Sequence, residues 1–407
     1  MEAGSIKQKA TTGVLWNAIE KFSVLAGQFM IGIVLARILM PKDFGLIGML
    51  SIFIVVSQSF VDSGMGLALV QKKDRTELDF STVFVFNFLI STLFYFILFF
   101  AAPFIADFYE MPQLVGISRI LTLNLIINSL AIVQRTRLVI NINFKTLAKI
   151  NVISVVIAGS CGIICANLGY GVWSLVVQNL VLATVSVVLY WSLSKWKPSL
   201  KFSKKSFNDL FGFGSKLLLA SIYGKILQNL YDLTIGKKFS AADLGYYNRS
   251  KSFVELSSGS ITRILHQVTY PVLCSLADDK ERMVAAYIRM IKMAGFMIFP
   301  VMTLLSLLAD PLIRFVLTDK WAMAIPLLQW MCFARIIYPV SVINMNLLNA
   351  IGRSDLYLKV DLSKFPFILF FLVAAIPYGV KAMIIGQVFS AIIGFFINAY
   401  YPGKFYG

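Results

Sequence analysis

Apolar segments of about 20 residues follow one another along almost the whole chain, separated by short polar stretches. A segment of this length crosses the hydrocarbon core of a bilayer as an α-helix, since each residue adds about 1.5 Å along the helix axis. The composition agrees, because 58% of the 407 residues are hydrophobic and 14% are charged, whereas about a quarter of the residues are charged in soluble domains. The sequence therefore predicts an all-α polytopic membrane protein.

We predict about twelve transmembrane helices from these segments. They occupy residues 12–38, 44–70, 78–102, 113–140, 146–167, 171–193, 207–236, 243–270, 284–308, 322–349, 355–376 and 379–400. The connections between them are no longer than about 20 residues, which leaves no room for a soluble catalytic domain on either face of the membrane. We therefore expect that the protein is not an enzyme.

The orientation follows from the positive charges in alternate loops. If the N-terminus is cytoplasmic, the cytoplasmic loops and termini hold 22 Lys and Arg residues and the opposite loops hold 8. Cytoplasmic loops carry the excess of Lys and Arg in membrane proteins. We therefore expect both termini to be cytoplasmic.

Short motifs recur in the two halves of the chain. Asp43-Phe44-Gly45 recurs as Asp243-Leu244-Gly245, and Pro103-Phe104-Ile105 recurs as Pro311-Leu312-Ile313. Each half holds an even number of predicted helices, so the halves share one orientation, as in parallel-repeat transporters. The repeat predicts two six-helix lobes, residues 1–200 and 201–407, around a central cavity. The Lys-rich linker Ser194–Ser206 between them is interpreted as a cytosolic tether whose lysines lie at anionic headgroups.

Polar residues lie on one face of several predicted helices when residues are placed 100° apart. In the helix over 12–38 these are Asn17, Lys21 and Gln28, with Glu20 beside them. In the helix over 207–236 they are Ser221, Lys225, Asn229 and Asp232, and in the helix over 243–270 they are Arg249, Ser252, Ser260, Arg263 and Gln267. Further polar residues are Asn124, Asn128 and Arg135 in the fourth predicted helix, and Arg335, Asn346 and Asn349 in the tenth.

Ionisable residues are costly inside a membrane and usually face a cavity or a partner. Near the expected interface of the lobes, the basic residues Lys21, Lys225, Arg249, Arg263 and Arg335 outnumber the acids Glu20 and Asp232. This excess favours a cationic cavity for an anionic substrate. The alternative is a set of interhelical ion pairs and hydrogen bonds, and Lys251 and Glu255, one helical turn apart, are expected to form such a pair.

Metal and nucleotide sites are not indicated. His266 is the only histidine, and the four cysteines lack the spacing of zinc ligands. No phosphate-binding glycine loop is present, and Gly212 and Gly214 are expected to ease the start of a helix. Asp43 and Asp243 are expected to be helix N-caps. We therefore expect no catalytic residue, no metal and no cofactor apart from a coupling H⁺ or Na⁺.

Several motifs point to a known family. They are Leu35-Ala-Arg-Ile-Leu-Met-Pro-Lys-Asp-Phe-Gly45, Val61-Asp-Ser-Gly-Met-Gly-Leu67, Gly169-Tyr-Gly-Val-Trp173, Phe211-Gly-Phe-Gly214, Gly236-Lys-Lys-Phe239, Leu244-Gly-Tyr-Tyr-Asn248 and Tyr270-Pro-Val272. With these motifs in this order, the chain resembles the Wzx-like polysaccharide flippases of the polysaccharide transport family, in the multidrug/oligosaccharidyl-lipid/polysaccharide (MOP) exporter superfamily. The resemblance implies a MOP/MATE-like fold, and related flippases have fourteen helices.

The resemblance also implies a function. It implies a bacterial inner-membrane protein that moves an undecaprenyl-diphosphate-linked oligosaccharide to the periplasmic leaflet by alternating access, for surface polysaccharides such as lipopolysaccharide. Glu20 and Lys21 match an acidic–basic pair of the family, and Lys225, Arg249 and Arg263 match basic positions that hold the diphosphate. The expected substrate-binding residues are Lys21, Lys225, Asn229, Arg249, Arg263 and Arg335, and the ion-coupling candidates are Glu20, Asp62 and Asp232.

The expected partners are the lipid-linked oligosaccharide, membrane lipids and the polysaccharide polymerase machinery, with no nucleic acid and a monomeric state. Two other functions stay open. A MATE-like small-molecule antiporter would favour an acidic cavity for organic cations. A membrane glycosyltransferase or polymerase would need acidic residues in a periplasmic loop, where only Asp107 and Glu110 lie together.

Overall fold

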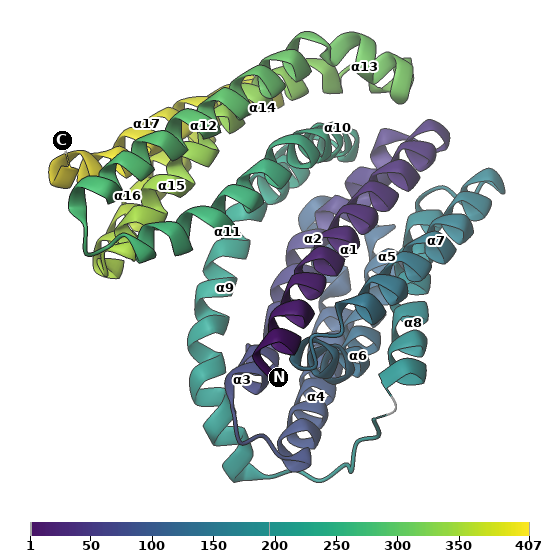
Figure 1. The fold of residues 1–407 in the computed structure, drawn as a ribbon. Helices are drawn as coiled ribbons and strands as arrows, with labels where there is room; N and C mark the ends of the chain where they lie inside the picture. Colours follow the sequence, from purple (N-terminus) through teal and green to yellow (C-terminus); the bar gives the residue numbers. More distant parts are fainter. Residues whose placement is uncertain (1, 195, 407) are drawn as a thin grey trace. The chain divides into compact units, whose positions relative to one another are not determined.

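The computed structural model describes residues 2–194 and 196–406, and these residues form helices joined by short connections (Figure 1). Within the described residues, ten helices are long and apolar enough to cross a membrane. By its internal contacts the chain divides into two compact units, Met1–Ala242 and Asp243–Gly407. The predicted boundary between lobes at residue 200 stays a prediction.

The first unit is a bundle of long helices with two short ones inserted. Its helices are α1 (Glu2–Ile38), α2 (Pro41–Asp62), α3 (Met65–Gln71), α4 (Glu77–Tyr109), α5 (Leu114–Leu121), α6 (Leu123–Ile140), α7 (Phe144–Asn167), α8 (Val172–Ser194) and α9 (Lys204–Lys238). Helix α7 packs against both α1 and α8, and α6 also packs against α8. Leu35, Leu39, Ala166 and Leu175 form one apolar core between α1, α7 and α8.

The second unit starts inside a long, bent helix. Its elements are α10 (Ala241–Val254), the π-helical segment η1 (Glu255–Gly259), α11 (Ser260–Ser275), α12 (Lys280–Leu307), α13 (Ala309–Val316), η2 (Asp319–Trp321), α14 (Ala324–Ile336), α15 (Tyr338–Ala350), α16 (Ser354–Ala375), η3 (Ile376–Tyr378) and α17 (Val380–Tyr406). Helix α14 packs between α12 and α17, and these three run side by side in Figure 1.

All twelve predicted ranges lie on helices, which confirms the all-helical fold. The number of spans differs from the prediction. The predicted helices over 207–236 and 243–270 correspond to α9 and to α10–η1–α11, and neither is among the ten candidate spans. The polar residues on these two helices lower their hydropathy below that of an ordinary span. The predicted helix over 44–70 is also broken, because Ser63 and Gly64 both take left-handed backbone conformations.

Glycines bring α2 and α9 into close contact. A Cβ atom added to Gly214, inside α9, would lie 2.5 Å from the Ser63 carbonyl oxygen. A Cβ atom on Gly64 would lie 2.6 Å from the Gly214 carbonyl oxygen. Small residues at membrane helix contacts allow backbones to approach in this way. The expectation that Gly214 eases the start of a helix is wrong, because Gly214 lies ten residues inside α9 and its small size serves helix packing.

Asp43 lies in the first turn of α2 rather than at the N-cap position, which Met40 occupies. Its carboxylate accepts a hydrogen bond of 2.9 Å from the Met40 backbone nitrogen. The expected stabilisation of free backbone amides at this helix end therefore holds, but from the third helical position.

The linker before α9 is fastened to the start of α4. The Ser199 hydroxyl donates a hydrogen bond of 2.9 Å to Ser81 Oγ, and the Ser203 backbone nitrogen donates one of 3.1 Å to Thr82 Oγ1. Trp196 is 7% exposed and packs with Phe80 and Phe84. The linker is thus docked along α4 rather than hanging as a free tether.

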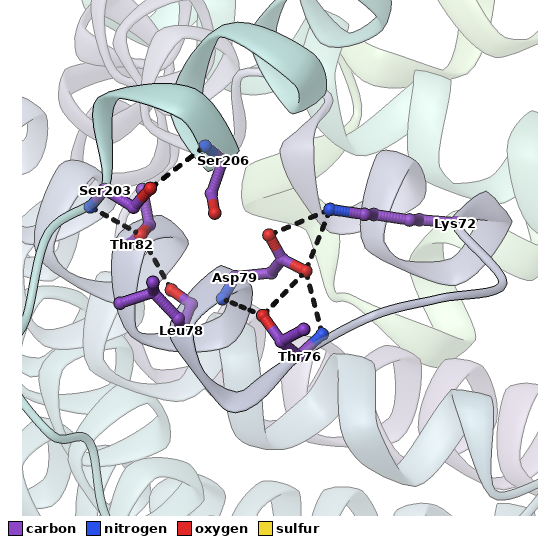
Figure 2. Close-up of polar contacts among 7 residues, drawn as sticks. All are labelled: Lys72, Thr76, Leu78, Asp79, Thr82, Ser203 and Ser206. Carbon is purple, nitrogen blue, oxygen red and sulfur yellow. Dashed lines mark hydrogen bonds and ion pairs between the residues drawn. The ribbon is translucent and has the colours of Figure 1, made fainter.

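A buried carboxylate organises the same region (Figure 2). Asp79, 1% exposed, forms an ion pair of 2.9 Å with Lys72 and accepts a hydrogen bond of 2.8 Å from the Thr76 backbone nitrogen. The Ser206 hydroxyl, from the first turn of α9, points toward the same carboxylate. Asp79 therefore links the ends of α3, α4 and α9.

Candidate functional site

The first unit contains an open cavity of about 830 Å³, with polar and apolar lining, between helices α1, α2, α3, α6, α7 and α8. Its charged lining residues are Glu20, Asp62 and Arg135, and its amide-bearing lining residues are Gln28, Gln58, Asn124, Asn128, Asn151 and Asn179. Thr136, Ser186 and Tyr190 add hydroxyl groups. Polar groups are costly among apolar spans, so a cavity with this lining is a candidate functional site.

Glu20 is held at one wall of the cavity by a chain of hydrogen bonds. Asn151 Nδ2, on α7, donates to Glu20 Oε1 at 2.5 Å. The Tyr190 hydroxyl, on α8, donates to Asn151 Oδ1 at 3.2 Å. Because both the nitrogen and the oxygen of the Asn151 amide form hydrogen bonds, the network fixes the orientation of this side chain and links α1, α7 and α8.

Asp62 lies at another wall and accepts a hydrogen bond of 2.9 Å from Gln58 Nε2, one turn earlier on α2. Lys225 and Arg135 lie close enough for their positive charges to act on this carboxylate. Lys225 Nζ, on α9, also donates a hydrogen bond of 2.8 Å to Ser59 Oγ. The structure therefore brings together two residues that the sequence analysis assigned to different roles, Asp62 and Lys225.

Helix α6 supplies a stripe of polar residues that are not among the expected substrate-binding residues. Asn124, Asn128 and Arg135 recur at helical spacing and line the cavity together. The Asn124 side-chain oxygen is buried and accepts no hydrogen bond from the residues that the structure describes. The helical spacing of these residues in the sequence predicted that they share one face of a helix. It could not show that this face lines the same cavity as Glu20 and Asp62.

The charged lining residues of this cavity are two acids and one base. Glu20, Asp62 and Arg135 line the same cavity, and the positive charges of Arg135 and Lys225 act on Asp62. A cationic excess, as the sequence predicted for the central cavity, is therefore not a property of this cavity. The predicted central cavity stays a prediction.

The other candidates of the first unit lie outside the lining of this cavity. Lys21 is exposed on α1. Asn229 Nδ2 donates a hydrogen bond of 2.8 Å to the Lys225 carbonyl oxygen within α9. Asp232 is 3% exposed, and its charge acts on the Tyr109 hydroxyl. Lys225, Asn229 and Asp232 thus occupy one face of α9, as their spacing predicted.

The candidates of the second unit differ in their surroundings. Arg249 is 7% exposed, and its guanidinium carbon lies 5.8 Å from the centre of the Trp321 ring. Arg335 forms an ion pair with Glu255 in η1, and its guanidinium carbon lies 4.9 Å from the centre of the Tyr338 ring. Arg263 is exposed, and its Nη2 atom lies 3.4 Å from Ser260 Oγ.

The ion pair of Glu255 joins different helices. The sequence had assigned Lys251, one turn earlier, as its partner, whereas the structure pairs the carboxylate with Arg335 from α14. The Lys251 ammonium group lies 5.7 Å from the centre of the Tyr247 ring. Helical spacing indicates neighbours on one helix only, so it could not reveal this partner.

Comparison with known sequences identifies the family. The model of the polysaccharide biosynthesis protein family matches residues 34–326, more than half of the chain. The teichuronic acid biosynthesis protein TuaB of Bacillus subtilis is 27% identical over 354 residues, which cover 86% of this chain and 73% of TuaB. The lipopolysaccharide biosynthesis protein WzxC of Escherichia coli is 23% identical over 400 residues, which cover 97% of this chain and 81% of WzxC.

Comparison with solved structures identifies the fold. The lipid II flippase MurJ, in an inward closed conformation, matches with a TM-score of 0.76 at 16% identity, covering 96% of this chain and 87% of MurJ. An inward-facing multidrug resistance MATE family transporter of the MOP superfamily matches with a TM-score of 0.73 at 15% identity, covering 96% and 98% of the two chains. The family and the fold that the sequence predicted are confirmed. This multi-pass membrane protein belongs to the polysaccharide biosynthesis protein family and shares the fold of these MurJ and MATE structures.

Proposed function

We propose that the protein is a flippase that translocates an undecaprenyl-diphosphate-linked oligosaccharide from the cytoplasmic to the periplasmic leaflet of a bacterial inner membrane. The observation that carries the proposal is the large polar cavity inside the apolar bundle of a polysaccharide biosynthesis family member. A sugar headgroup with a diphosphate cannot cross hydrocarbon unaided, and a hydrated cavity that opens alternately to each side lowers that barrier.

The names of related proteins support this assignment. TuaB and WzxC are named for the biosynthesis of teichuronic acid and lipopolysaccharide, and a further relative from Rhizobium meliloti is named a succinoglycan biosynthesis transport protein. Each of these names refers to the biosynthesis of a glycan. We propose that the oligosaccharide that this protein moves is built into a surface polysaccharide, and that the protein contacts the polymerase machinery that extends it.

The basic residues are proposed to hold the diphosphate. These are Lys21, Lys225, Arg249, Arg263 and Arg335, with Asn229 as a neutral hydrogen-bond donor. A guanidinium group can bind phosphate oxygens with two parallel hydrogen bonds, whereas an ammonium group acts as a compact point charge. The exposed position of Arg263 and the buried position of Arg249 give these two arginines different access to a ligand.

The carboxylates Glu20, Asp62 and Asp232 are proposed to couple transport to an H⁺ or Na⁺ gradient. Two of them line the cavity, and the third is buried in α9. A carboxylate inside a span can release or bind a cation as its surroundings change between states. This binding would return the empty carrier to its starting state.

A small-molecule antiporter is the second candidate function, and the carboxylates of the cavity favour it. Glu20 and Asp62 could bind an organic cation directly, and a MATE transporter shares the fold. The nearby charges of Arg135 and Lys225 oppose this assignment, because they reduce the attraction of the cavity for a cation.

Reconstitution distinguishes the two functions. Purified protein in proteoliposomes is supplied with fluorescent undecaprenyl-diphosphate oligosaccharide in one leaflet, and the fraction that reaches the opposite leaflet is measured with an impermeant quencher. A flippase raises this fraction above that of protein-free vesicles, and the same vesicles do not accumulate tetraphenylphosphonium. Accumulation of tetraphenylphosphonium without lipid translocation would establish the antiporter instead.

A further inference from the structure

We propose that the cavity of the first unit binds the uncharged sugars of the oligosaccharide headgroup, as a site separate from the basic residues proposed for the diphosphate. This inference rests on the proposed function and assigns the sugar part of the substrate to particular residues. It starts from the chemistry of the cavity wall.

The wall is rich in groups that both donate and accept hydrogen bonds. Six amide side chains and the hydroxyl groups of Thr136, Ser186 and Tyr190 line the cavity. Asn151, Gln58 and Asn179 already donate hydrogen bonds within the protein, so Gln28, Asn124 and Asn128 are the amides assigned to a ligand. An amide group offers two N–H donors and a carbonyl acceptor, and a hydroxyl group can do either. Sugar hydroxyl groups need such mixed partners, whereas a diphosphate, which only accepts, needs donors alone.

The charged groups of the wall are two carboxylates, Glu20 and Asp62, and one guanidinium group, Arg135. Glu20 accepts a hydrogen bond from Asn151, and Asp62 accepts one from Gln58 and lies near the positive charges of Arg135 and Lys225. A wall with two carboxylates does not attract a diphosphate, and the positive charges of Arg135 and Lys225 reduce its attraction for an organic cation. A neutral ligand with many hydroxyl groups fits it better than either ion.

The size and the apolar part of the wall also fit a saccharide. The volume of about 830 Å³ lies within the range of about 300–1,000 Å³ that is usual for small-ligand sites. Val24, Leu67, Val70, Ile132 and Leu182 supply apolar surface for the C–H faces of sugar rings.

Helix α6 holds the residues for the sharpest test. Asn124 lines the cavity, and its side-chain oxygen is shielded from solvent without a hydrogen-bond partner among the described residues, so the amide group must rotate to offer this oxygen to a ligand. Asn128 lies one turn further on the same face and lines the same cavity. Asn124 and Asn128 are therefore assigned to sugar hydroxyl groups.

The experiment measures protection of a cysteine in the cavity. In a variant without its four native cysteines, Ser186→Cys provides one reactive thiol on α8, and the full-length protein is placed in nanodiscs. The probe is the free oligosaccharide obtained by mild acid hydrolysis of the lipid-linked repeat units of the host. We expect this probe to slow modification of the thiol by a maleimide, whereas inorganic pyrophosphate does not.

Substitutions then locate the site. Asn124→Leu and Asn128→Leu should each raise the oligosaccharide concentration for half-protection about tenfold, as loss of one or two hydrogen bonds requires. Asn128→Ser, which keeps a polar group and tests the site if the leucine variants do not fold, should raise it severalfold. The matched control is Asn167→Leu, because Asn167 is exposed at the end of α7 and lies outside the cavity lining.

Three outcomes would overturn the inference. In the first, millimolar oligosaccharide does not protect the thiol. In the second, pyrophosphate or tetraphenylphosphonium protects the thiol and the oligosaccharide does not. In the third, the oligosaccharide protects the thiol equally well in the α6 variants. Translocation of the lipid-linked oligosaccharide in proteoliposomes tests the proposed function separately. Cysteine protection without translocation would reject the flippase and keep the sugar site. Translocation without cysteine protection would keep the flippase and reject the sugar site.

Discussion

The indole nitrogen of Trp196, in the linker before α9, donates a hydrogen bond of 2.6 Å to Glu77 Oε2 at the start of α4. Arg137, from the end of α6, binds the same carboxylate at 2.8 Å and lies over the rings of Phe80 and Trp196. Three segments that are far apart in the sequence thus meet at one acidic residue. The linker is therefore part of the folded first unit, and its attachment can be tested.

Trp196→Ala is expected to release the linker. The substitution removes the hydrogen bond to Glu77 and the packing against Phe80 and Phe84, and replacing a buried aromatic residue by alanine costs about 3–5 kcal/mol. Trypsin should cleave after the exposed Lys201 several times faster than in the wild type, and the melting temperature should fall. Trp173→Ala is the control, since Trp173 is 40% exposed. Equal cleavage of wild type and Trp196→Ala would contradict docking of the linker.

Gly212 and Gly214 should respond oppositely to alanine. A Cβ atom on Gly212 meets no atom of the described residues within 4 Å, whereas one on Gly214 would meet the backbone at Ser63 and Gly64. Gly212→Ala should leave stability unchanged or raise it by up to about 1 kcal/mol, because alanine favours the helix. Gly214→Ala should lower the melting temperature, because α9 must move away from α2. The two variants are compared by thermal unfolding of purified protein, and similar shifts for both would show that the glycine contact does not matter.

The sequence predicted the positions of the helices, but it did not predict which side chains on different helices contact each other. Apolar runs of about 20 residues determine where a membrane helix can form, so all twelve ranges lie on helices. Helical spacing also shows which residues share a face, as for Asn124, Asn128 and Arg135. It cannot show which helix that face meets. The pairs Glu20–Asn151, Glu77–Trp196 and Glu255–Arg335 each join separate elements, and only the folded structure reveals them.

The predicted orientation is tested by the accessibility of introduced cysteines. The positive charge of the loops predicts that Lys201 and Asp279 are cytoplasmic and that Glu110 is periplasmic. The background must lack the native cysteines, because Cys274 is exposed. In intact cells, an impermeant thiol reagent should label Glu110→Cys and should reach Lys201→Cys and Asp279→Cys only after the cells are permeabilised. Labelling of position 201 from outside would reverse the orientation.

Ion coupling is tested by removing one carboxylate at a time. Glu20→Gln, Asp62→Asn and Asp232→Asn keep the shape of each side chain but remove its charge. At least one of them should lose the dependence of the initial translocation rate on an imposed H⁺ or Na⁺ gradient in proteoliposomes. Asp278→Asn is the matched control, because Asp278 is exposed between α11 and α12. If all three variants keep the gradient dependence of the wild type, these carboxylates do not couple transport.

Substitution of Arg263 and of Arg335 distinguishes an arginine that binds substrate from one that stabilises the fold. Arg335 is paired with Glu255, so Arg335→Ala leaves a carboxylate without its partner inside a membrane protein and should lower the amount of folded protein. The double variant Arg335→Ala with Glu255→Gln should restore that amount. Arg263 is exposed, with a contact to Ser260, so Arg263→Ala should leave the amount of protein unchanged.

If Arg263 binds the diphosphate, Arg263→Ala should reduce glycan export by about 10- to 100-fold, the value of one or two charge-assisted hydrogen bonds. Arg263→Lys should restore export only in part, because lysine keeps the charge but not the planar pair of donors. Lys204→Ala, at the exposed start of α9, is the control and should change little. The measurement is export per membrane-inserted protein. Wild-type export by Arg263→Ala would remove this arginine from the proposed diphosphate site.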